Sequence, residues 1–381
     1  MLSGAAAERV LDRFLRSRRD LPADARQAAA EAVFGVALWR LRLRFQAGEG
    51  APPLHLLASL LRDLAGRPDA EGLCGLPVGA LPPPVPSPTD LATRFSMPGW
   101  LAETLVREVG AEAPLLADAL CMPGPVFLRV NRARTTRDGL ARRLAAEGIA
   151  TRPTGLAPDG LEVLSSRPNL LALPSFREGL LEVQDEGSQL LGEAVGARPG
   201  ETVLDLCAGA GGKTLQLAAA VGPGGRVHAC DPDEARLGRL RVRAGRAGAS
   251  PHVHGKEPPA GLLADRVLVD APCSELGALR RGPDLRFRLD PASFAALPAL
   301  QLGILQRAAS HVRPGGRLVY ATCTLRREED EEVARAFEGG REEFTRRDAL
   351  PGLSDGEGFL RLWPHRHGTD GFFAVAWTRT G

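Results

Sequence analysis

The second half of the chain alternates short apolar runs with segments of helical periodicity, and no other feature constrains the fold as strongly. The run "TVLDLCA" (202–208) is followed by "RVHACDP", "RVLVDAP" and "RLVYATCT", with helical segments such as "GKTLQLAAAV" between them. Short apolar strands joined through helices are typical of a parallel sheet with right-handed crossovers. We therefore predict an α/β fold with a doubly wound, Rossmann-like sheet that binds ligands at the carboxyl ends of its strands.

The first half of the chain predicts two smaller parts. Residues 5–62 carry apolar side chains at helical spacing, which favours an all-helical unit. The stretch "GLPVGALPPPVPSPTD" (75–90) is too rich in proline to continue a helix, and after it helices and a strand–turn–helix pattern (125–149) indicate a small α+β segment. We expect a helical domain at 1–80, a linker at 81–90, a helical plus small α+β segment at 91–180 and a further domain at 181–381.

The amino-acid composition excludes several classes of protein but does not identify a binding partner. The chain has 381 residues, of which 44% are hydrophobic and 25% charged, as in globular proteins. A formal net charge of +2 is too small to indicate a polyanionic partner by itself. The six cysteines contain no C-x-x-C pair, which argues against a zinc site and a disulfide scaffold. Without an 18-residue apolar run or a signal peptide, we expect a cytoplasmic protein with reduced thiols.

The loop "DLCAGAGGKT" (205–214) places four glycines between a strand and a helix, where backbone can approach a ligand closely. A P-loop would need glycine where Cys207 stands, and a dinucleotide fingerprint starting at Gly209 would need glycine where Thr214 stands. S-adenosylmethionine is the third candidate, because its amino acid part needs a tight loop without a pyrophosphate cradle.

An acid follows the second strand at the position expected for a nucleoside contact. Asp231 lies 22 residues after Gly209, where a carboxylate can accept hydrogen bonds from both ribose hydroxyls. The alternative is that Asp231 caps the helix that begins in "CDPDEARL".

Two cysteines follow two neighbouring strands. Cys273 stands in "VDAPCS" and Cys323 in "YATCT", so both thiols should lie at the sheet edge that carries the glycine loop. A thiolate that adds to C6 of a pyrimidine makes C5 nucleophilic enough to take a methyl group, and a second thiol can assist release. Asp270 could hydrogen-bond the N3 and exocyclic amine edge of cytosine. The residues alone do not say which cysteine attacks, and two coincidental core cysteines remain the alternative.

Several motifs together resemble the RsmB-type branch of the Nop/Sun family of RNA (cytosine-5) methyltransferases, from about residue 91 to the C-terminus. They are "LDLCAGAGGKT", "DAPCSELGALRRGPDLRF", "GGRLVYATCTLRREED" and "DGFFAVAWTR". The resemblance implies that residues 181–381 are the catalytic domain with a methyltransferase sheet and that the α+β segment at 91–180 binds RNA. It also implies that the helical domain at the N-terminus is a shortened NusB-like domain that contributes to RNA binding. It also implies an enzyme that methylates C5 of cytosine in RNA, with small-subunit ribosomal RNA as the first substrate and transfer RNA as the alternative.

The resemblance also assigns residues. It makes Cys323 the nucleophile that forms the C6 adduct, and Cys273 the residue that aids product release. We expect Arg280 and Arg281, close behind the Pro-Cys motif, to contact RNA. The residues that match S-adenosylmethionine contacts are Cys207, Ala208, Gly209, Ala210, Gly211, Gly212, Lys213, Asp231 and Asp270.

One position departs from the family pattern. The family usually has a Gly-Asp pair after the third strand, whose acid contacts the adenine amine, but here "HVHGKEPP" puts Lys256 in that place. Either Glu257 substitutes or the cofactor depends on other contacts. The competing functions are a catalytically weak RNA-binding or ribosome assembly factor and, more distantly, a dinucleotide-dependent dehydrogenase. We expect a monomer that needs neither a metal nor a membrane.

Overall fold

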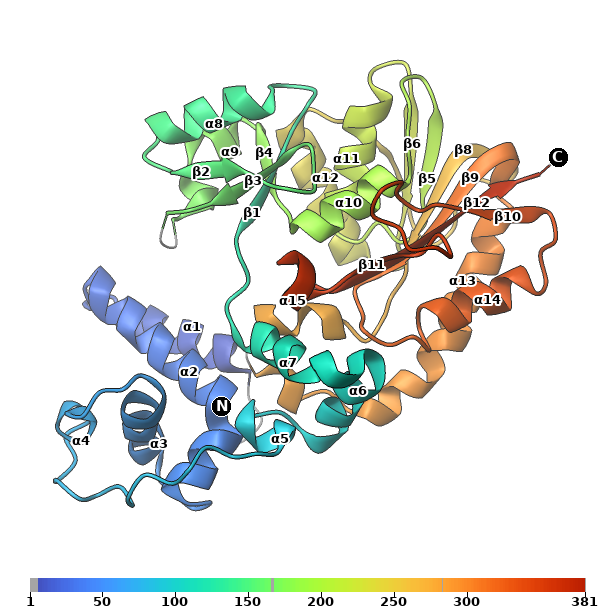
Figure 1. The fold of residues 1–381 in the computed structure, drawn as a ribbon. Coiled ribbons are helices and arrows are strands. Elements are labelled where there is room, and N and C mark those ends of the chain that lie inside the picture. The colour runs from blue at the N-terminus through green and yellow to red at the C-terminus, as the bar shows by residue number, and fades with distance from the viewer. Residues whose placement is uncertain (1–5, 166–167, 283, 381) are drawn as a thin grey trace. The chain divides into compact units, whose positions relative to one another are not determined.

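The computed structural model describes residues 6–165, 168–282 and 284–380 (Figure 1). Packing divides the chain into two compact units, each made from two stretches of sequence. Unit 1 comprises Met1–Pro123 and Leu279–Pro291, and unit 2 comprises Gly124–Ala278 and Ala292–Gly381. The domain boundaries given above stay predictions.

Unit 1 is built from helices, as the apolar spacing predicts. Buried leucines such as Leu43, Leu56, Leu101, Leu105 and Leu116 form its interior. The helices are α1 (Ala7–Ser17), α2 (Ala23–Ala47), α3 (Pro53–Ser59), α4 (Ala70–Leu73), α5 (Leu91–Arg94), α6 (Gly99–Val109) and α7 (Ala113–Cys121).

A segment from the second half of the chain belongs to unit 1. Arg286, in the stretch Leu279–Pro291, is completely buried and donates hydrogen bonds to the carbonyl oxygens of Leu120 (2.7 Å) and Phe95 (3.4 Å). The carboxylate of Asp284 accepts a hydrogen bond from the backbone N–H of Ala7 at 3.0 Å. The chain therefore enters unit 1 only a few residues after the Pro-Cys motif.

Unit 2 begins with a four-stranded antiparallel sheet of order β2-β3-β1-β4. Its apolar face packs on α8 through residues such as Leu128, Leu140, Leu144 and Leu161. The elements are β1 (Phe127–Val130), α8 (Arg137–Ala146), β2 (Thr151–Pro153), β3 (Gly160–Val163), α9 (Pro174–Arg177) and β4 (Leu181–Val183).

The main sheet of unit 2 has the strand order β10-β12-β9-β8-β5-β6-β7, with β11 paired to β12. Strands β7, β6, β5, β8 and β9 are parallel, as predicted, whereas β12 runs antiparallel to β9 and to β10. The strands are β5 (Thr202–Asp205), β6 (Arg226–Cys230), β7 (His252–His254), β8 (Ala264–Asp270), β9 (Val312–Thr322), β10 (Phe344–Arg347), β11 (Leu360–Leu362) and β12 (Phe372–Arg379).

Helices cover both faces of this sheet, so it is doubly wound (Figure 1). Alternate residues of each strand point to opposite faces, and Val203 packs toward α10 and α11 while Leu204 packs toward α13. The helices are α10 (Glu186–Ala194), α11 (Gly212–Val221) and α12 (Glu234–Ala247) on one face, α13 (Leu297–Ala309) and α14 (Glu331–Glu338) on the other, and α15 (Pro364–His367) before β12. The α/β fold class with a helical N-terminal region is confirmed.

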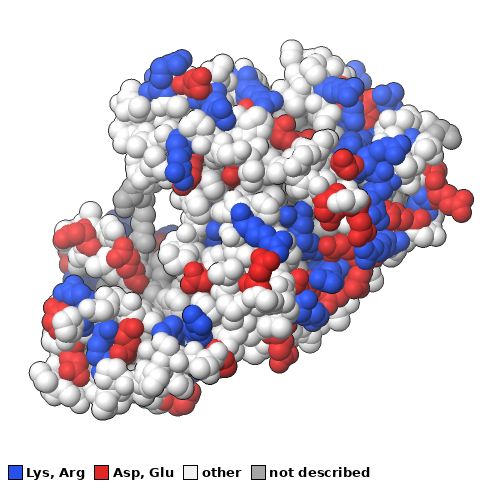
Figure 2. All heavy atoms as spheres, in the orientation of Figure 1, with Lys and Arg blue, Asp and Glu red and all other residues white. Residues whose placement is uncertain are grey.

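Charges of both signs lie next to one another on the face of unit 2 that carries α14 and β10 (Figure 2). Arg335 of α14 pairs with Glu357 at 3.1 Å, and Arg341, shortly before β10, pairs with Glu343 at 3.3 Å. Such interspersed pairs do not make a single-sign patch. Within the described residues, no helix is long and apolar enough to cross a lipid bilayer.

Candidate active site

The glycine loop connects β5 to α11 and is held in a tight turn. Gly209 and Gly211 have φ of 54° and 90°, values that favour glycine. A Cβ atom on Gly211 would lie 2.7 Å from Cγ of Leu240, so a larger residue would also clash. The loop therefore brings its backbone close to whatever occupies the adjoining space.

Asp231 follows β6 and fixes the glycine loop from the neighbouring strand. It is 5% exposed, and its Oδ2 accepts a hydrogen bond from the N–H of Gly209 at 2.9 Å. Its Oδ1 accepts from the N–H of Asp233 at 2.8 Å. The helix cap is Asp233, which accepts from the N–H groups of Ala235 and Arg236. The alternative role of Asp231 as the cap of α12 is therefore wrong.

A cavity of about 730 Å³ opens within unit 2 at the carboxyl ends of these strands. Its size is within the range of small-molecule sites. The residues proposed from the sequence that line it are Cys207, Ala208, Gly209, Ala210, Gly212, Lys213, Asp231, Asp270, Cys273 and Cys323. Gly211 shapes the turn without being among the lining residues.

Lys213 and Asp270 form an ion pair inside the cavity, with Nζ and Oδ2 2.8 Å apart. Burial alone would lower the pKa of Lys213, but the charge and hydrogen bond of Asp270 outweigh it, and the pKa is raised. Lys213 is therefore a cation whose charge is matched by Asp270.

Asp205 is a buried acid of the cavity that the sequence analysis missed. Burial raises its pKa to about 7, against the opposing effect of the hydrogen bond from Thr214 Oγ1 at 2.7 Å. Its Oδ1 is buried and has no hydrogen-bond partner among the described residues. The sequence did contain a signal for this site residue, because Asp205 is the last residue of its strand, as Asp270 is of β8.

The thiols of Cys273 and Cys323 lie 3.4 Å apart, Sγ to Sγ, at the wall of the cavity. The hydrogen bond to Cys323 and burial raise the pKa of Cys273 well above its ordinary value. Cys273 is therefore a protonated thiol at neutral pH, and either sulfur can be the donor in the hydrogen bond between the two thiols. Burial and the nearby Asp205, Asp270 and Asp231 also raise the pKa of Cys207.

The small sheet also reaches the glycine loop, which the sequence did not indicate. Arg129 of β1, 3% exposed, donates through Nη1 to the carbonyl oxygen of Gly212 at 2.6 Å. Arg243 of α12 donates to the carbonyl oxygen of Ala210 at 2.8 Å and pairs with Glu182 of β4 at 2.8 Å. Both arginines tie the loop to the small sheet.

Of four other residues singled out from the sequence, one lines the cavity and three lie elsewhere. Lys256 follows β7 and lines the cavity, whereas Glu257 pairs with Arg307 at 3.3 Å and is not among the lining residues. Arg280 and Arg281 end the 3₁₀ segment Leu276–Arg281 and are counted with unit 1. Their contact with RNA stays a prediction. No group of three or more His, Cys, Asp or Glu within the described ranges could hold a metal ion.

A Rossmann-like sheet with an antiparallel strand beside β9, and a glycine loop facing two strand-end cysteines, defines a methyltransferase of the Nop/Sun class. A family model described as 16S rRNA methyltransferase RsmB/F matches residues 194–378, and one described as an RsmF/B-like, ferredoxin-like domain matches residues 97–168. The chain belongs to this RsmB/F family, which confirms the resemblance seen in the sequence.

Similar proteins and solved structures support the same family. The chain is 36% identical over 298 residues to a probable ribosomal RNA small subunit methyltransferase B of Synechocystis, covering 74% of this chain and 67% of that protein. It is 34% identical over 312 residues to a protein of the same name from Bacillus subtilis, covering 76% and 68%. The solved structure of a methyltransferase homolog protein from Pyrococcus horikoshii superposes with a TM-score of 0.68 at 26% identity, covering 77% and 99%.

Proposed function

We propose that this protein transfers a methyl group from S-adenosylmethionine to C5 of a cytosine in RNA, and that the RNA is small-subunit ribosomal RNA. The observation that carries the proposal is the pair of thiols 3.4 Å apart beside the glycine loop. The ribosomal substrate is inferred from the names of the relatives in Synechocystis and Bacillus subtilis. Such a substrate places the activity in the cytoplasm.

The residues of the cavity fit S-adenosylmethionine, which supplies an activated methyl group when bound. Its sulfonium and ammonium groups are positive, and Asp205, Asp231 and Asp270 line the cavity. Oδ1 of Asp205 is a buried acceptor without a hydrogen-bond partner among the described residues, and a positive ligand in the cavity would favour the ionised form of this acid. Asp231 can accept hydrogen bonds from the ribose, because each carboxylate oxygen has two lone pairs.

In the proposed reaction, the thiolate of Cys323 adds to C6 of the cytosine and forms the S–C6 bond. The electron pair of the C5–C6 double bond moves away from C6, so that C5 gains the density it needs to take up the methyl group. The carboxylate of Asp270 accepts a hydrogen bond from the exocyclic amine of the base, and from N3 once that nitrogen is protonated in the adduct. Lys213 fixes the position of Asp270.

Release requires that a base take the C5 proton, so that the electron pair of the C5–H bond re-forms the C5–C6 double bond and the S–C6 bond breaks. The thiol of Cys273 is at hydrogen-bond distance from the sulfur of Cys323 and can donate to it as that bond breaks. The raised pKa of Cys273, caused by the hydrogen bond to Cys323 and by burial, supports this donor role. Since the target base must reach a thiol inside a cavity, it must be unpaired or flipped out of a helix.

Purified protein, methyl-labelled S-adenosylmethionine and either small-subunit ribosomal RNA or transfer RNA test the proposal. We expect label in the ribosomal RNA, a bisulfite-resistant cytosine at one position, and loss of both with Cys323→Ser. Label in transfer RNA alone would show the same chemistry on the other substrate. Undetectable cofactor binding by calorimetry in a folded sample would instead identify an assembly factor without catalysis.

A further inference from the structure

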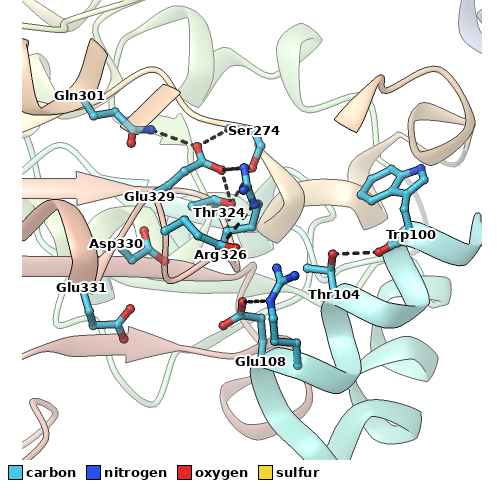
Figure 3. Close-up of polar contacts among 12 residues, drawn as sticks. Trp100, Thr104, Glu108, Ser274, Gln301, Thr324, Arg326, Glu329, Asp330 and Glu331 are labelled. Atoms are coloured by element: carbon cyan, nitrogen blue, oxygen red, sulfur yellow. Dashed lines mark hydrogen bonds and ion pairs between the residues drawn. The ribbon is translucent and has the colours of Figure 1, made fainter. Parts of the chain in front are cut away.

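The two thiols do not lie on the strands themselves, so something beyond the sheet must set their separation. Cys273 follows β8 by three residues and Cys323 follows β9 by one, and loops at strand ends have more conformational freedom than the ladder. In Figure 3 the carboxylate of Glu329 points toward Ser274, which follows Cys273 in the chain, and Thr324, which follows Cys323. The Glu329 side chain is fully buried and lies in unit 2, as do all the partners described below.

Glu329 is hydrogen-bonded to the residue after Cys273 and, through Gln301, to the residue before it. Its Oε2 accepts a hydrogen bond from the backbone N–H of Ser274 at 2.9 Å, and its Oε1 accepts from the hydroxyl of Ser274 at 2.6 Å. Gln301 of α13 donates through Nε2 both to Glu329 Oε2 at 3.0 Å and to the carbonyl oxygen of Pro272 at 2.9 Å. The residues before and after Cys273 are therefore tied, directly or through one amide, to the same carboxylate.

The same carboxylate reaches the residue after Cys323. The hydroxyl of Thr324 is 3.4 Å from Glu329 Oε1 and 2.7 Å from the hydroxyl of Ser274. Arg326 donates to Oε1 at 3.2 Å and matches the buried charge. The strand-end segments also meet directly, because the N–H of Gly277 donates to the carbonyl oxygen of Cys323 at 3.0 Å.

This arrangement needs an ionised carboxylate rather than any polar side chain. The groups around Glu329 include a backbone N–H, an amide N–H and a guanidinium, all of which can only donate. A glutamine at 329 would turn its own NH₂ toward a donor and leave at least one buried group unsatisfied, which costs about 1–3 kcal/mol. Hydrogen bonds to a charged acceptor are also the stronger kind.

We propose that Glu329 is a positioning residue that holds Cys273 and Cys323 at the separation where one thiol can act on the other. Glu329 is not among the residues lining the cavity, so it acts through Ser274, Thr324 and Gln301 rather than on the substrate. The expected effect of Glu329 on catalysis rests on the proposed function, whereas its expected effect on the separation of the two thiols does not.

Phenylarsine oxide measures the thiol pair without RNA or cofactor. It condenses with two neighbouring thiols, forming two As–S bonds and releasing one water, with no change in the oxidation state of sulfur. A preorganised pair has a high effective concentration, so we expect Glu329→Gln to weaken arsenical binding by about tenfold or more. Glu338→Gln is the control, since Glu338 is a part-buried carboxylate of unit 2 that pairs with Arg346 away from the thiols. Cys273→Ala defines the affinity of a site without the pair.

Arsenical binding by Glu329→Gln at the wild-type affinity overturns the proposal. If that variant does not fold, Ser274→Ala decides instead, because it removes two side-chain hydrogen bonds and keeps the backbone contact. We then expect a smaller loss of affinity, and an unchanged affinity overturns the proposal equally.

A second measurement concerns the reaction. With RNA and S-adenosylmethionine, Glu329→Gln should lower kcat with little change in KM for RNA and should increase the trapped fraction of covalent protein–RNA adduct. An adduct fraction equal to the wild type overturns the catalytic consequence. If the wild type forms no methylcytosine at all, the proposed function fails, while a changed arsenical affinity still supports the positioning of the thiols.

Discussion

Arg129 Nη1 lies 2.6 Å from the carbonyl oxygen of Gly212, so strand β1 of the small sheet supports the point where the glycine loop enters helix α11. The two residues are 83 positions apart in the chain. Burial lowers the pKa of Arg129 to about 10, and Glu182 acts in the opposite direction, so the guanidinium remains charged at neutral pH. This contact makes the small sheet part of the proposed cofactor site.

Arg129→Lys should therefore weaken S-adenosylmethionine binding. Lysine keeps the charge but lacks the Nη1 group, which alone donates to Gly212, Gln184 and Gln216. We expect a loss of about tenfold in affinity, the value of one hydrogen bond to a charged group, measured by calorimetry. Arg132→Lys is the control, because Arg132 is half-exposed and pairs with Asp159. Equal affinities of the two variants would contradict a supporting role for Arg129.

The two cysteines should give opposite results when each is replaced. Cys273→Ala removes the thiol that donates to the leaving sulfur, so a covalent protein–RNA adduct should accumulate and shift on a denaturing gel. Cys323→Ala should give no adduct because it lacks the nucleophile. The reverse pattern would exchange the two proposed roles.

Lys256→Asp should strengthen cofactor binding. Lys256 lines the cavity where the family usually has an acid, and a carboxylate there could accept a hydrogen bond from the adenine amine. We expect the Kd for S-adenosylmethionine to fall by about threefold to tenfold, which corresponds to a gain in binding free energy of at most about 1.4 kcal/mol. Lys256→Met separates loss of positive charge from gain of an acceptor. An unchanged Kd in both variants would show that position 256 does not contact the cofactor.

A cluster of imidazoles should make unit 2 less stable in acid. His228 stacks on His252 and lies 3.0 Å from His254, ring nitrogen to ring nitrogen. Burial, followed by the charges of these histidines and of Arg226, lowers the pKa of His228 to about 4. Between pH 6.5 and 4 the unfolded chain binds a proton that the folded chain does not, so stability falls as pH falls through this window.

We expect His228→Asn to reduce this dependence. From pH 7 to pH 5 the free energy of unfolding of the wild type should fall by about 1 kcal/mol more than that of the variant, with solvent screening of the half-exposed ring taken into account. Urea unfolding at both pH values measures the difference. Parallel pH dependence of the two proteins would mean that His228 does not titrate differently on folding.

Much of the candidate site could be predicted before the structure was known. The carboxyl ends of parallel strands meet at one edge of a sheet, so Asp231, Cys273 and Cys323 had to approach the glycine loop once their strands were recognised. Choosing Cys323 over Cys273 as nucleophile needed the family resemblance, because strand ends alone make both thiols equivalent.

The antiparallel strand β12 was harder to anticipate. Its residues "FFAVAWTR" are almost continuously buried, and an apolar run of this kind does not reveal the direction of a strand or its neighbours. Only the pairing of Phe373 with Thr322 and of Trp377 with Leu318 places it beside β9.

The sequence by itself determined the alternation of strands and helices, the family, and the edge of the sheet where the chemistry is proposed, since these depend on local periodicity and motifs. Only the tertiary structure decided which side chains support that edge. Arg129 reaches Gly212, Glu329 joins the segments of both thiols, and Arg286 buries a loop of the second half in the helical unit. Such contacts join residues far apart in the chain, and their energies come from burial and hydrogen-bond geometry that no local pattern encodes.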